Sequence, residues 1–339
     1  MATMKDIANS VGVSLTTVSN VVHGNYDRVS PQMVQRILHA IEEMHYVPNM
    51  SARALVSHSS RIIAYVDTHS PQEAYAGNGF AGLLLSGLEG VVTDHGYFLM
   101  MRRGTDEAVL RLMLNNWNPD GVIFRDCVPM SLVQFVKNQK KPCVTINTYL
   151  DDPTLIQVRA SDREGGRIAT EHLLALGHRD LLFIGAVHTG FMNNDQRYLG
   201  HCDALRAAGI EPHPRHLINS LHPFNAERGI EVGRRLAACG GFTGICVSGD
   251  QYAVAIMSGL REGGMRIPQD VSVVGFDDAD IARMAYPPLT TVRQDGIAKG
   301  QLAAEALFSL IAGESPDPAR FTLPVKLVVR ASTGPAPLS

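Results

Sequence analysis

The sequence is poor in cysteine, has no long apolar run and carries almost no net charge. Its five cysteines are odd in number and form no CxxC pair, which argues against a disulfide framework and a cysteine zinc site. The longest apolar runs fall well short of the roughly 18 residues of a membrane span, so we expect no transmembrane helix. A net charge of −3 with 45% hydrophobic residues excludes a mainly disordered chain.

The N-terminal residues lack both a secretory leader and a basic excess. The first ten, MATMKDIANS, do not run from charged to apolar, so we expect a cytoplasmic protein. The basic side chains of the first 60 residues are balanced by acidic ones: Lys5, Arg28, Arg36 and Arg53 against Asp6, Asp27, Glu42 and Glu43. No basic patch marks a nucleic-acid-binding surface there, so DNA binding has to be inferred from pattern.

Residues 1–47 have the pattern of three short helices that can share a small core. Gly12 supplies a sharp turn after the first helix, and Ser14 can cap a second helix over residues 15–23. Pro31 then marks the start of a third helix. Two short helices around a glycine turn are typical of a helix-turn-helix motif.

The second of these helices is the candidate reader of DNA. Its outward side chains can approach phosphates and base edges: Leu15, Thr16, Thr17, Ser19 and Asn20. Asparagine can form paired hydrogen bonds with adenine, and the threonine methyl group or leucine can contact a thymine methyl group. The alternative is a small helical protein-interaction module in which these side chains are simply solvated.

Residues 48–60 are predicted to be a hinge and linker. Pro48 disfavours helix in the residue before it and so ends the N-terminal module. Asn49 can cap a short helix that reaches Ser57. A helix of this length is marginal alone in water, so we expect it to form only when something packs against it.

From Arg61 onward, strand and helix patterns alternate in two series, which predicts two doubly wound parallel sheets in two similar lobes. Ligands of such folds bind beyond the carboxyl ends of the strands. Acidic, arginine and aromatic side chains fall at these positions: Asp67, Phe80, Arg125, Asp126, Asp162, Arg197, Phe224, Asp250, Asp277 and Asp278. Such a set suits a polyol or sugar between two lobes. The alternative is that they are helix caps and surface charges.

The sequence gives no positive sign of catalysis. Residues 77–82 read GxGxxG, but about ten residues separate them from the first strand, too many for a dinucleotide site. His213 and His216 lack a third potential metal ligand nearby, so we expect a loop there. No nucleophile, base and orienting group come together in the pattern. We therefore expect no enzyme activity, no cofactor and no metal.

Several segments together carry the pattern of a known family. They are MKDIA at 4–8, GVSLTTVS at 12–19, YVPN at 46–49, EHL at 171–173, LGH at 176–178, DVSVVGFDD at 270–278 and PLTTV at 288–292. With these segments the sequence resembles the LacI/GalR family of bacterial transcription regulators over nearly its whole length. The resemblance implies an all-α headpiece, a two-lobed core similar to periplasmic sugar-binding proteins, and a repressor controlled by a small-molecule effector.

The resemblance also implies which residues contact operator DNA. The base-reading positions are Leu15, Thr16 and Asn20, and the phosphate-contacting positions are Thr3, Ser14, Thr17 and Asn49. A hinge helix containing Ala52 and Leu55 would enter the minor groove beside its symmetry-related copy, with Leu55 as the wedge between base pairs.

The implied organisation is a headpiece over 1–47, a hinge and linker over 48–60, and an effector-binding and dimerisation core over 61–339. The core has an N-lobe of about residues 61–160 and 294–320 and a C-lobe of about residues 161–293 and 321–339. The chain would cross between the lobes near Ala160, Arg293 and Arg320. The family's effector positions correspond to Phe80, Arg125, Asp162, Arg197, Phe224, Asp250, Asp277 and Gln294, of which Gln294 comes from the resemblance alone.

Some residues depart from the family pattern. Asn20 stands where many members have arginine, which predicts a different operator, and Gly79 and Gly249 replace larger side chains, which favours a bulkier effector. The expected effector is a sugar, a sugar acid or a phosphosugar, and Arg125 at its strand end could pair with a carboxylate or phosphate on such a ligand. A purine is the alternative, because Phe80 and Phe224 could face a base.

The last residues contain two prolines, Pro335 and Pro337, and no leucine heptad. We therefore expect a homodimer, which would read a pseudo-palindromic operator in two half-sites. A solute-binding protein for transport is a less favoured alternative, because it would need export.

Overall fold

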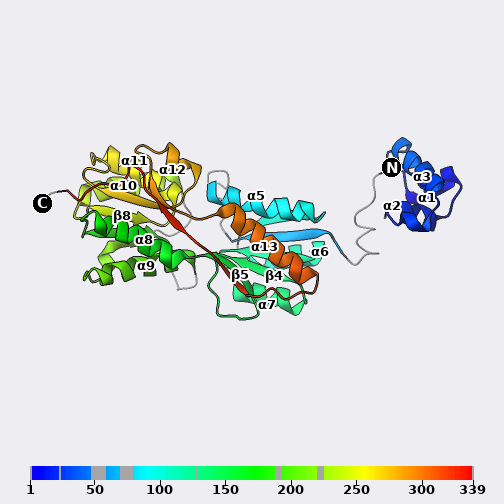
Figure 1. Ribbon diagram of the computed structural model, residues 1–339, viewed down its shortest axis with the longest axis horizontal. Helices are drawn as coiled ribbons and strands as arrows, with labels where there is room; N and C mark the ends of the chain where they lie inside the picture. Colours follow the sequence, from blue (N-terminus) through cyan, green and yellow to red (C-terminus); the bar gives the residue numbers. More distant parts are fainter. Residues whose placement is uncertain are drawn as a thin grey trace. The chain divides into compact units, whose positions relative to one another are not determined.

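The computed structural model describes residues 2–22, 24–46, 59–68, 79–104, 106–126, 128–187, 192–219 and 225–337. They belong to two compact units, Met1–Ser60 and Arg61–Ser339, which are treated separately below (Figure 1). Within these ranges, no helix is long and apolar enough to cross a membrane. The predicted site residues Asn49, Ala52, Leu55 and Phe224 lie outside the described residues.

The first unit contains the three predicted helices. They are α1 (Met4–Val11), α2 (Leu15–Val22) and α3 (Pro31–Glu43), with a short 3-10 turn, η1 (Tyr26–Arg28), that the sequence pattern did not predict. Each helix turns an apolar stripe inward, and buried residues such as Ile7, Val18 and Ile37 form a common core. The prediction of a small three-helix module is therefore confirmed.

Local interactions define the start of α1 and both sides of the turn between α1 and α2. Thr3 and Asp6 form a reciprocal capping box at the start of α1. Gly12 ends α1 with a φ angle of +73°, a conformation that side chains with a Cβ atom rarely adopt. Ser14 then caps α2, because its hydroxyl oxygen accepts from the Thr17 amide at 3.1 Å. These three features make the helix-turn-helix angle a local property of the sequence.

The second unit contains two six-stranded sheets, as the alternation predicted. The N-lobe sheet has the order β11-β5-β4-β3-β1-β2 and is all parallel; its strands are β1 (Ile62–Asp67), β2 (Phe98–Arg103), β3 (Gly121–Arg125), β4 (Cys143–Ile146), β5 (Ile156–Ala160) and β11 (Arg320–Leu323). The C-lobe sheet has the order β12-β10-β9-β8-β6-β7; its strands are β6 (Leu181–Gly185), β7 (Leu217–Asn219), β8 (Gly244–Val247), β9 (Ser272–Asp277), β10 (Thr290–Arg293) and the antiparallel β12 (Lys326–Val328). The pattern did not identify β5, β10, β11 or β12.

Helices cover both faces of each sheet. In the N-lobe they are α5 (Gly79–Asp94), α6 (Glu107–Trp117), α7 (Met130–Asn138) and α13 (Gly296–Ile311). In the C-lobe they are α8 (Asp162–Ala175), α9 (Asn193–Ala207), α10 (Ala226–Cys239), α11 (Asp250–Glu262) and α12 (Asp280–Met284). Successive residues of β1 enter different cores: Ile63 and Tyr65 pack with α5 and α13, whereas Ala64 and Val66 pack with α6 and α7. This alternation explains why the strands are apolar without interruption.

The chain crosses between the two sheets three times. The first crossings follow Ala160 of β5 and Arg293 of β10, as expected. The third lies between Leu323 and Lys326, because β11 pairs in parallel with β5 from Arg320 to Leu323 and β12 begins at Lys326 in the other sheet.

Candidate functional site

The carboxyl ends of the strands bring together most of the predicted effector residues. Asp67 and Arg125 end β1 and β3, Asp277 ends β9, and Gln294 follows β10. Asp162 and Asp250 are the first residues of the helices that follow β5 and β8, and Arg197 lies in the first turns of α9. This placement follows from the parallel pairing, because the carboxyl ends of parallel strands lie at the same edge of a sheet.

Arg125 is held between two aspartates. Its Nη1 donates to Oδ2 of Asp67 at 2.9 Å, and its Nε lies 3.0 Å from Oδ2 of Asp126. All three residues are buried, with exposed fractions of 4% or less. The positive charge of Arg125 is thus already matched by more than one negative charge within the N-lobe.

Arg197 forms a second buried ion pair, at the start of the C-lobe. Its Nε donates to Oδ1 of Asp162 at 2.9 Å, and its Nη1 donates to the Ser248 carbonyl oxygen at 2.5 Å. The guanidinium group stacks 3.5 Å from the centre of the Phe276 ring, which fixes its plane. The pair joins the ends of three strands, because these groups follow or end β5, β8 and β9.

Tyr149 is a further neighbour of this ion pair. Its hydroxyl donates to Oδ2 of Asp162 at 2.7 Å. Burial and the adjacent Asp162 carboxylate raise the pKa of Tyr149, so the phenol keeps its proton and remains a donor. Asp162 therefore receives hydrogen bonds on both carboxylate oxygens, which holds it in one orientation.

A chain of hydrogen bonds runs from the N-lobe to the C-lobe. Nδ2 of Asn147 donates to Oδ1 of Asp126 at 3.0 Å, and Nζ of Lys299 donates to Oδ1 of Asn147 at 2.9 Å. The same ammonium donates to Oε1 of Gln294 at 2.6 Å, and Nε2 of Gln294 donates to Oδ1 of Asp277 at 2.6 Å. The two lobes are therefore connected by an uninterrupted polar network.

Asp250 and Asp277 form an acidic pair in the C-lobe. Oδ2 of Asp250 accepts from the Ala279 amide at 2.9 Å, and its Oδ1 accepts from the Thr291 hydroxyl at 2.5 Å. Burial, together with the negative charge of Asp277, raises the pKa of Asp250 well above its ordinary value. Burial also raises the pKa of Asp277 to about 6, against the opposing effect of Arg197. The pair can thus hold a proton near neutral pH.

Unusual backbone conformations are concentrated at the same strand ends. Asp126, Asn147, Asp277 and Asp278 have φ angles of 62°, 60°, 121° and 57°. Residues other than glycine rarely adopt positive φ, and such strain is typical of functional sites. Asp126, Asn147 and Asp277 belong to the network described above, whereas Asp278 pairs with Arg293 and Arg330.

Sequence reasoning missed three members of this network. Asn147 directly follows the apolar run of β4, so the strand-end rule could have identified it. Lys299 is a lone charge on the apolar stripe of α13, on the same face as Ala303 and Leu307, and this pattern is a usable signal. Tyr149 gave no signal, because it lies in an irregular segment between β4 and β5.

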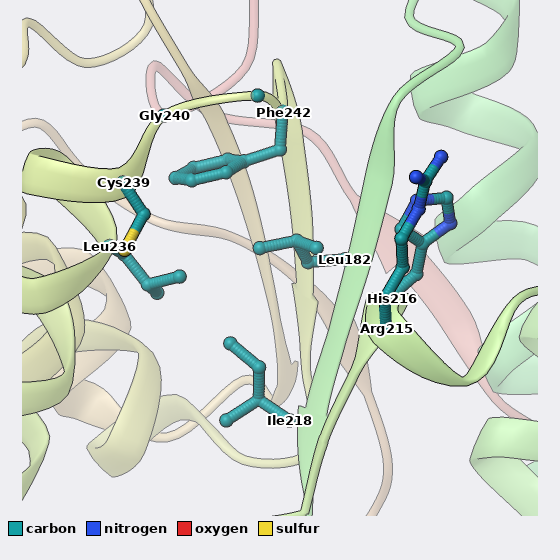
Figure 2. A pocket seen from close by; sticks show the side chains of 9 residues that line it. Leu182, Arg215, His216, Ile218, Leu236, Cys239, Gly240 and Phe242 are labelled. Atoms are coloured by element: carbon teal, nitrogen blue, oxygen red, sulfur yellow. The ribbon is translucent and has the colours of Figure 1, made fainter.

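A separate cavity of about 330 Å³ lies elsewhere in the C-lobe, beside β6, β7 and α10. The side chains of Leu182, Leu236 and Phe242 converge on it, whereas those of Arg215 and His216 lie on the other side of the strand (Figure 2). Besides these apolar side chains, the residues that line the cavity include Arg215, His216 and Cys239.

In the headpiece, the outward face of α2 carries the predicted reading residues. Leu15 is 51% exposed and Thr16 is exposed, whereas Asn20 is partly exposed. The hydroxyl groups of Ser14 and Thr17 lie 2.8 Å apart at the start of the helix. The hydroxyl group and the backbone N–H of Thr3 both donate to Oδ2 of Asp6, at 2.7 and 2.8 Å, so in this structure Thr3 caps α1.

These features define a class of protein: a helix-turn-helix module joined to a two-lobed ligand-binding core. Residues 3–49 match the sequence profile of bacterial regulatory proteins of the lacI family, and residues 170–333 match that of the periplasmic binding protein-like domain. The transcriptional regulator CelR of Thermobifida fusca is 32% identical over 97% of this chain and 98% of its own. The chain belongs to the lacI family of bacterial transcriptional regulators.

Solved structures agree with this assignment. A complex of the transcriptional regulator CelR with cellobiose is 28% identical, covers 98% of this chain and 100% of that chain, and gives a TM-score of 0.73. The lac repressor dimer bound to operator and the anti-inducer ONPF is 25% identical, covers 98% of this chain and 99% of that chain, and gives a TM-score of 0.82. The protein is thus a DNA-binding transcriptional regulator with an effector-binding core, and its family is one of regulators rather than enzymes.

Proposed function

We propose that this regulator is a homodimeric repressor whose affinity for operator DNA is controlled by a neutral polyhydroxyl compound, such as a sugar, bound at the strand ends of the core. The balance of acidic and basic groups in the network is the observation that supports a neutral ligand. Five carboxyl groups (Asp67, Asp126, Asp162, Asp250 and Asp277) accompany three cations (Arg125, Arg197 and Lys299). A further negative charge would meet an excess of acids, whereas hydroxyl groups can donate to carboxylates and accept from cations.

The position of Arg125 weakens the case for a sugar acid or phosphosugar. That hypothesis required a guanidinium free to pair with an anion of the ligand. Asp67 and Asp126 already occupy two of its edges at 2.9 and 3.0 Å. Recruiting Arg125 would leave a buried carboxylate without its partner, which is costly. The bound cellobiose of the related CelR structure is in keeping with a neutral sugar.

The DNA-binding part of the proposal uses the exposed face of α2. Leu15, Thr16 and Asn20 read base edges in the major groove, and Ser14 and Thr17 present hydroxyls to phosphates at the helix start. Asn49 adds a phosphate contact, and the hinge residues Ala52 and Leu55 enter the minor groove. A homodimer places two such units on a pseudo-palindrome.

The mechanism follows from the network that joins the lobes. An effector that prefers one arrangement of the lobes shifts the equilibrium between them, and the core transmits this shift to the hinge. A coupling free energy of about 1–3 kcal/mol would change operator affinity roughly 5–150-fold.

The test is a thermal-shift panel on the full-length protein. Matched probes separate the ligand classes: glucose and cellobiose, gluconate and glucuronate, glucose 6-phosphate, and the purines hypoxanthine and guanine. A ligand at about 100 times its dissociation constant adds about 2.7 kcal/mol of stability. Stabilisation by a neutral sugar, followed by a change in operator affinity, supports the proposal; stabilisation only by an acid, a phosphate or a purine overturns the ligand class.

A pair of variants locates the site. Arg197→Ala removes the buried partner of Asp162 and is expected to abolish the thermal shift. Arg163→Ala removes an exposed arginine of α8 that pairs with Asp203, and is expected to leave the shift unchanged. Size measurement by light scattering tests the homodimer, whose mass would be twice 36.8 kDa.

A further inference from the structure

Lys299 is a fully buried cation in the first turn of α13, with an exposed fraction of 0%. Its ammonium donates to Oδ1 of Asn147 at 2.9 Å and to Oε1 of Gln294 at 2.6 Å. Both acceptors are neutral amides, and among the described residues no carboxylate forms a salt bridge with this ammonium. Arg125 and Arg197, by contrast, each contact an aspartate directly.

The chemistry of an ammonium group fixes the direction of both amides. An ammonium only donates, so the oxygen of each amide must face Nζ. The NH₂ group of Asn147 then faces Asp126 at 3.0 Å, and that of Gln294 faces Asp277 at 2.6 Å. Asn147 follows β4 of the N-lobe and Gln294 follows β10 of the C-lobe. One cation therefore determines which end of each amide, oxygen or NH₂, faces its neighbours in the two lobes.

The surroundings keep Lys299 charged at neutral pH. Three acidic groups act on it, Asp162 at the start of α8, Asp277 at the end of β9 and Asp126 after β3, and Arg197 of α9 opposes them. The Phe80 ring of α5 covers it at 5.3 Å. Burial lowers the pKa of Lys299 to about 8, so it is cationic at pH 7 and loses its proton only in mildly alkaline solution.

We propose that Lys299 is a positioning residue of the effector site: it orients Asn147 and Gln294, so that each lobe presents a fixed set of hydrogen-bond donors and acceptors. Two of its three N–H groups have acceptors among the described residues, which leaves one for an oxygen of the effector. The ligand class rests on the proposed function, but the amide orientation is a property of the protein without ligand. Without the ammonium, each side-chain amide can flip, which exchanges the positions of its oxygen and its NH₂ group.

The test compares Lys299→Met with Lys141→Met in the full-length, perdeuterated protein. Methionine keeps a long unbranched side chain and removes the charge and the donors. Lys141 is a suitable control, because it is a second lysine of the N-lobe, it donates to the Pro119 carbonyl oxygen at 2.7 Å, and partial burial lowers its pKa as well. The probe is the ¹⁵N signal of Asn and Gln side-chain amides from about pH 7 to about pH 9.5, assigned with Asn147→Ser and Gln294→Ser.

We expect the signals of Asn147 and Gln294 to shift together with a midpoint near pH 8 in the wild type and in Lys141→Met. In Lys299→Met this titration is expected to be absent. The inference is overturned if neither signal titrates in the wild type, or if the titration persists without Lys299. Should Lys299→Met not fold, the wild-type titration and Lys141→Met still decide the point.

A second arm uses cellobiose as the probe. If it stabilises the wild type, Lys299→Met is expected to weaken its affinity roughly tenfold or more, with Lys141→Met unchanged. Unchanged cellobiose affinity in Lys299→Met would overturn the role in effector recognition. Failure of cellobiose and of every other neutral probe on the wild type counts against the proposed function instead, and the amide titration is independent of that outcome.

Discussion

Gly166 of α8 lies against the backbone of Arg197 in α9, so closely that a Cβ atom at position 166 would be 1.9 Å from the Arg197 carbonyl oxygen. The helix pair can approach only because position 166 has no side chain. This approach brings the Arg197 guanidinium to Asp162 at 2.9 Å. The position of Arg197, a predicted effector residue, therefore depends on the missing side chain of Gly166.

Gly166→Ala tests this dependence. The added methyl group has no space, so α9 must move, and overpacking of this kind costs about 1–3 kcal/mol. We expect a lower melting temperature and loss of the effector-induced thermal shift. Gly90→Ala is the matched control, because a Cβ at this exposed position of α5 meets nothing within 4 Å. Removal of a mid-helix glycine there is expected to stabilise the protein by about 0.5–1 kcal/mol. An unchanged thermal shift in Gly166→Ala would contradict the argument.

Asp277→Asn tests the acidic pair through the pH dependence of stability. Because the pKa of Asp277 is raised from 3.8 to about 6, the folded state binds a proton more tightly than the unfolded state. The resulting stabilisation is complete below 3.8 and is lost as the pH rises through about 6. At pH 7, Asp277→Asn is therefore expected to raise the melting temperature, and the gain should disappear as the pH falls toward 4.

Asp270→Asn is the control of opposite sign. The hydrogen bonds from Arg266 lower the pKa of Asp270 to about 2, so its carboxylate stabilises the fold above 3.8 and loses this effect as the pH falls through about 2. At pH 7 this variant is expected to melt at a lower temperature. The same sign for both variants would rule out the assigned pKa directions.

Leu15→Ala tests the reading face of α2. Leu15 is 51% exposed, so truncation should leave the stability of the headpiece nearly unchanged. Loss of one apolar contact with a thymine methyl group is expected to lower operator affinity about tenfold, or about 1.4 kcal/mol. Fluorescence anisotropy with the operator and with a random duplex measures the difference. Equal loss on both sequences would show that Leu15 does not read bases.

Leu55→Ala tests the expected minor-groove wedge. The wedge unstacks a base step and is stabilised by the contacts that bending permits, so its removal should weaken operator binding more than binding to a random duplex. The binding ratio between the two duplexes is the measurement. A ratio equal to that of the wild type would eliminate the wedge.

Local patterns predicted the parts of the fold that depend on neighbours in sequence. Gly12, Ser14 and Pro31 mark helix boundaries through their own backbone chemistry, and the structure has helices there. Apolar runs predicted most strands of both sheets. The pattern missed β5 and β10–β12, because strands of three to five residues carry too little periodicity.

The candidate site likewise has a part that local sequence predicted and a part that only packing decided. Asp67, Arg125 and Asp277 were predicted because each ends a strand, and a strand end has a known place in a parallel sheet. The sequence could not indicate that Arg125 is neutralised by two aspartates, so it left an anionic ligand open beside a neutral sugar. Asp67 lies 58 residues before Arg125, and only the packing of β1 beside β3 brings their side chains together.

Composition, helix signals and strand alternation thus determined the class of this protein: a helix-turn-helix module and a two-lobed core with polar residues at the strand ends. The tertiary structure alone decided the electrostatics of that site. Lys299 is separated from Asn147 by 152 residues, and a buried ammonium acquires its partners, its pKa and its influence on two amides only when distant segments exclude water around it. Charge balance in a buried site depends on distances through space, and the periodicity of a sequence does not predict these distances for residues far apart in the chain.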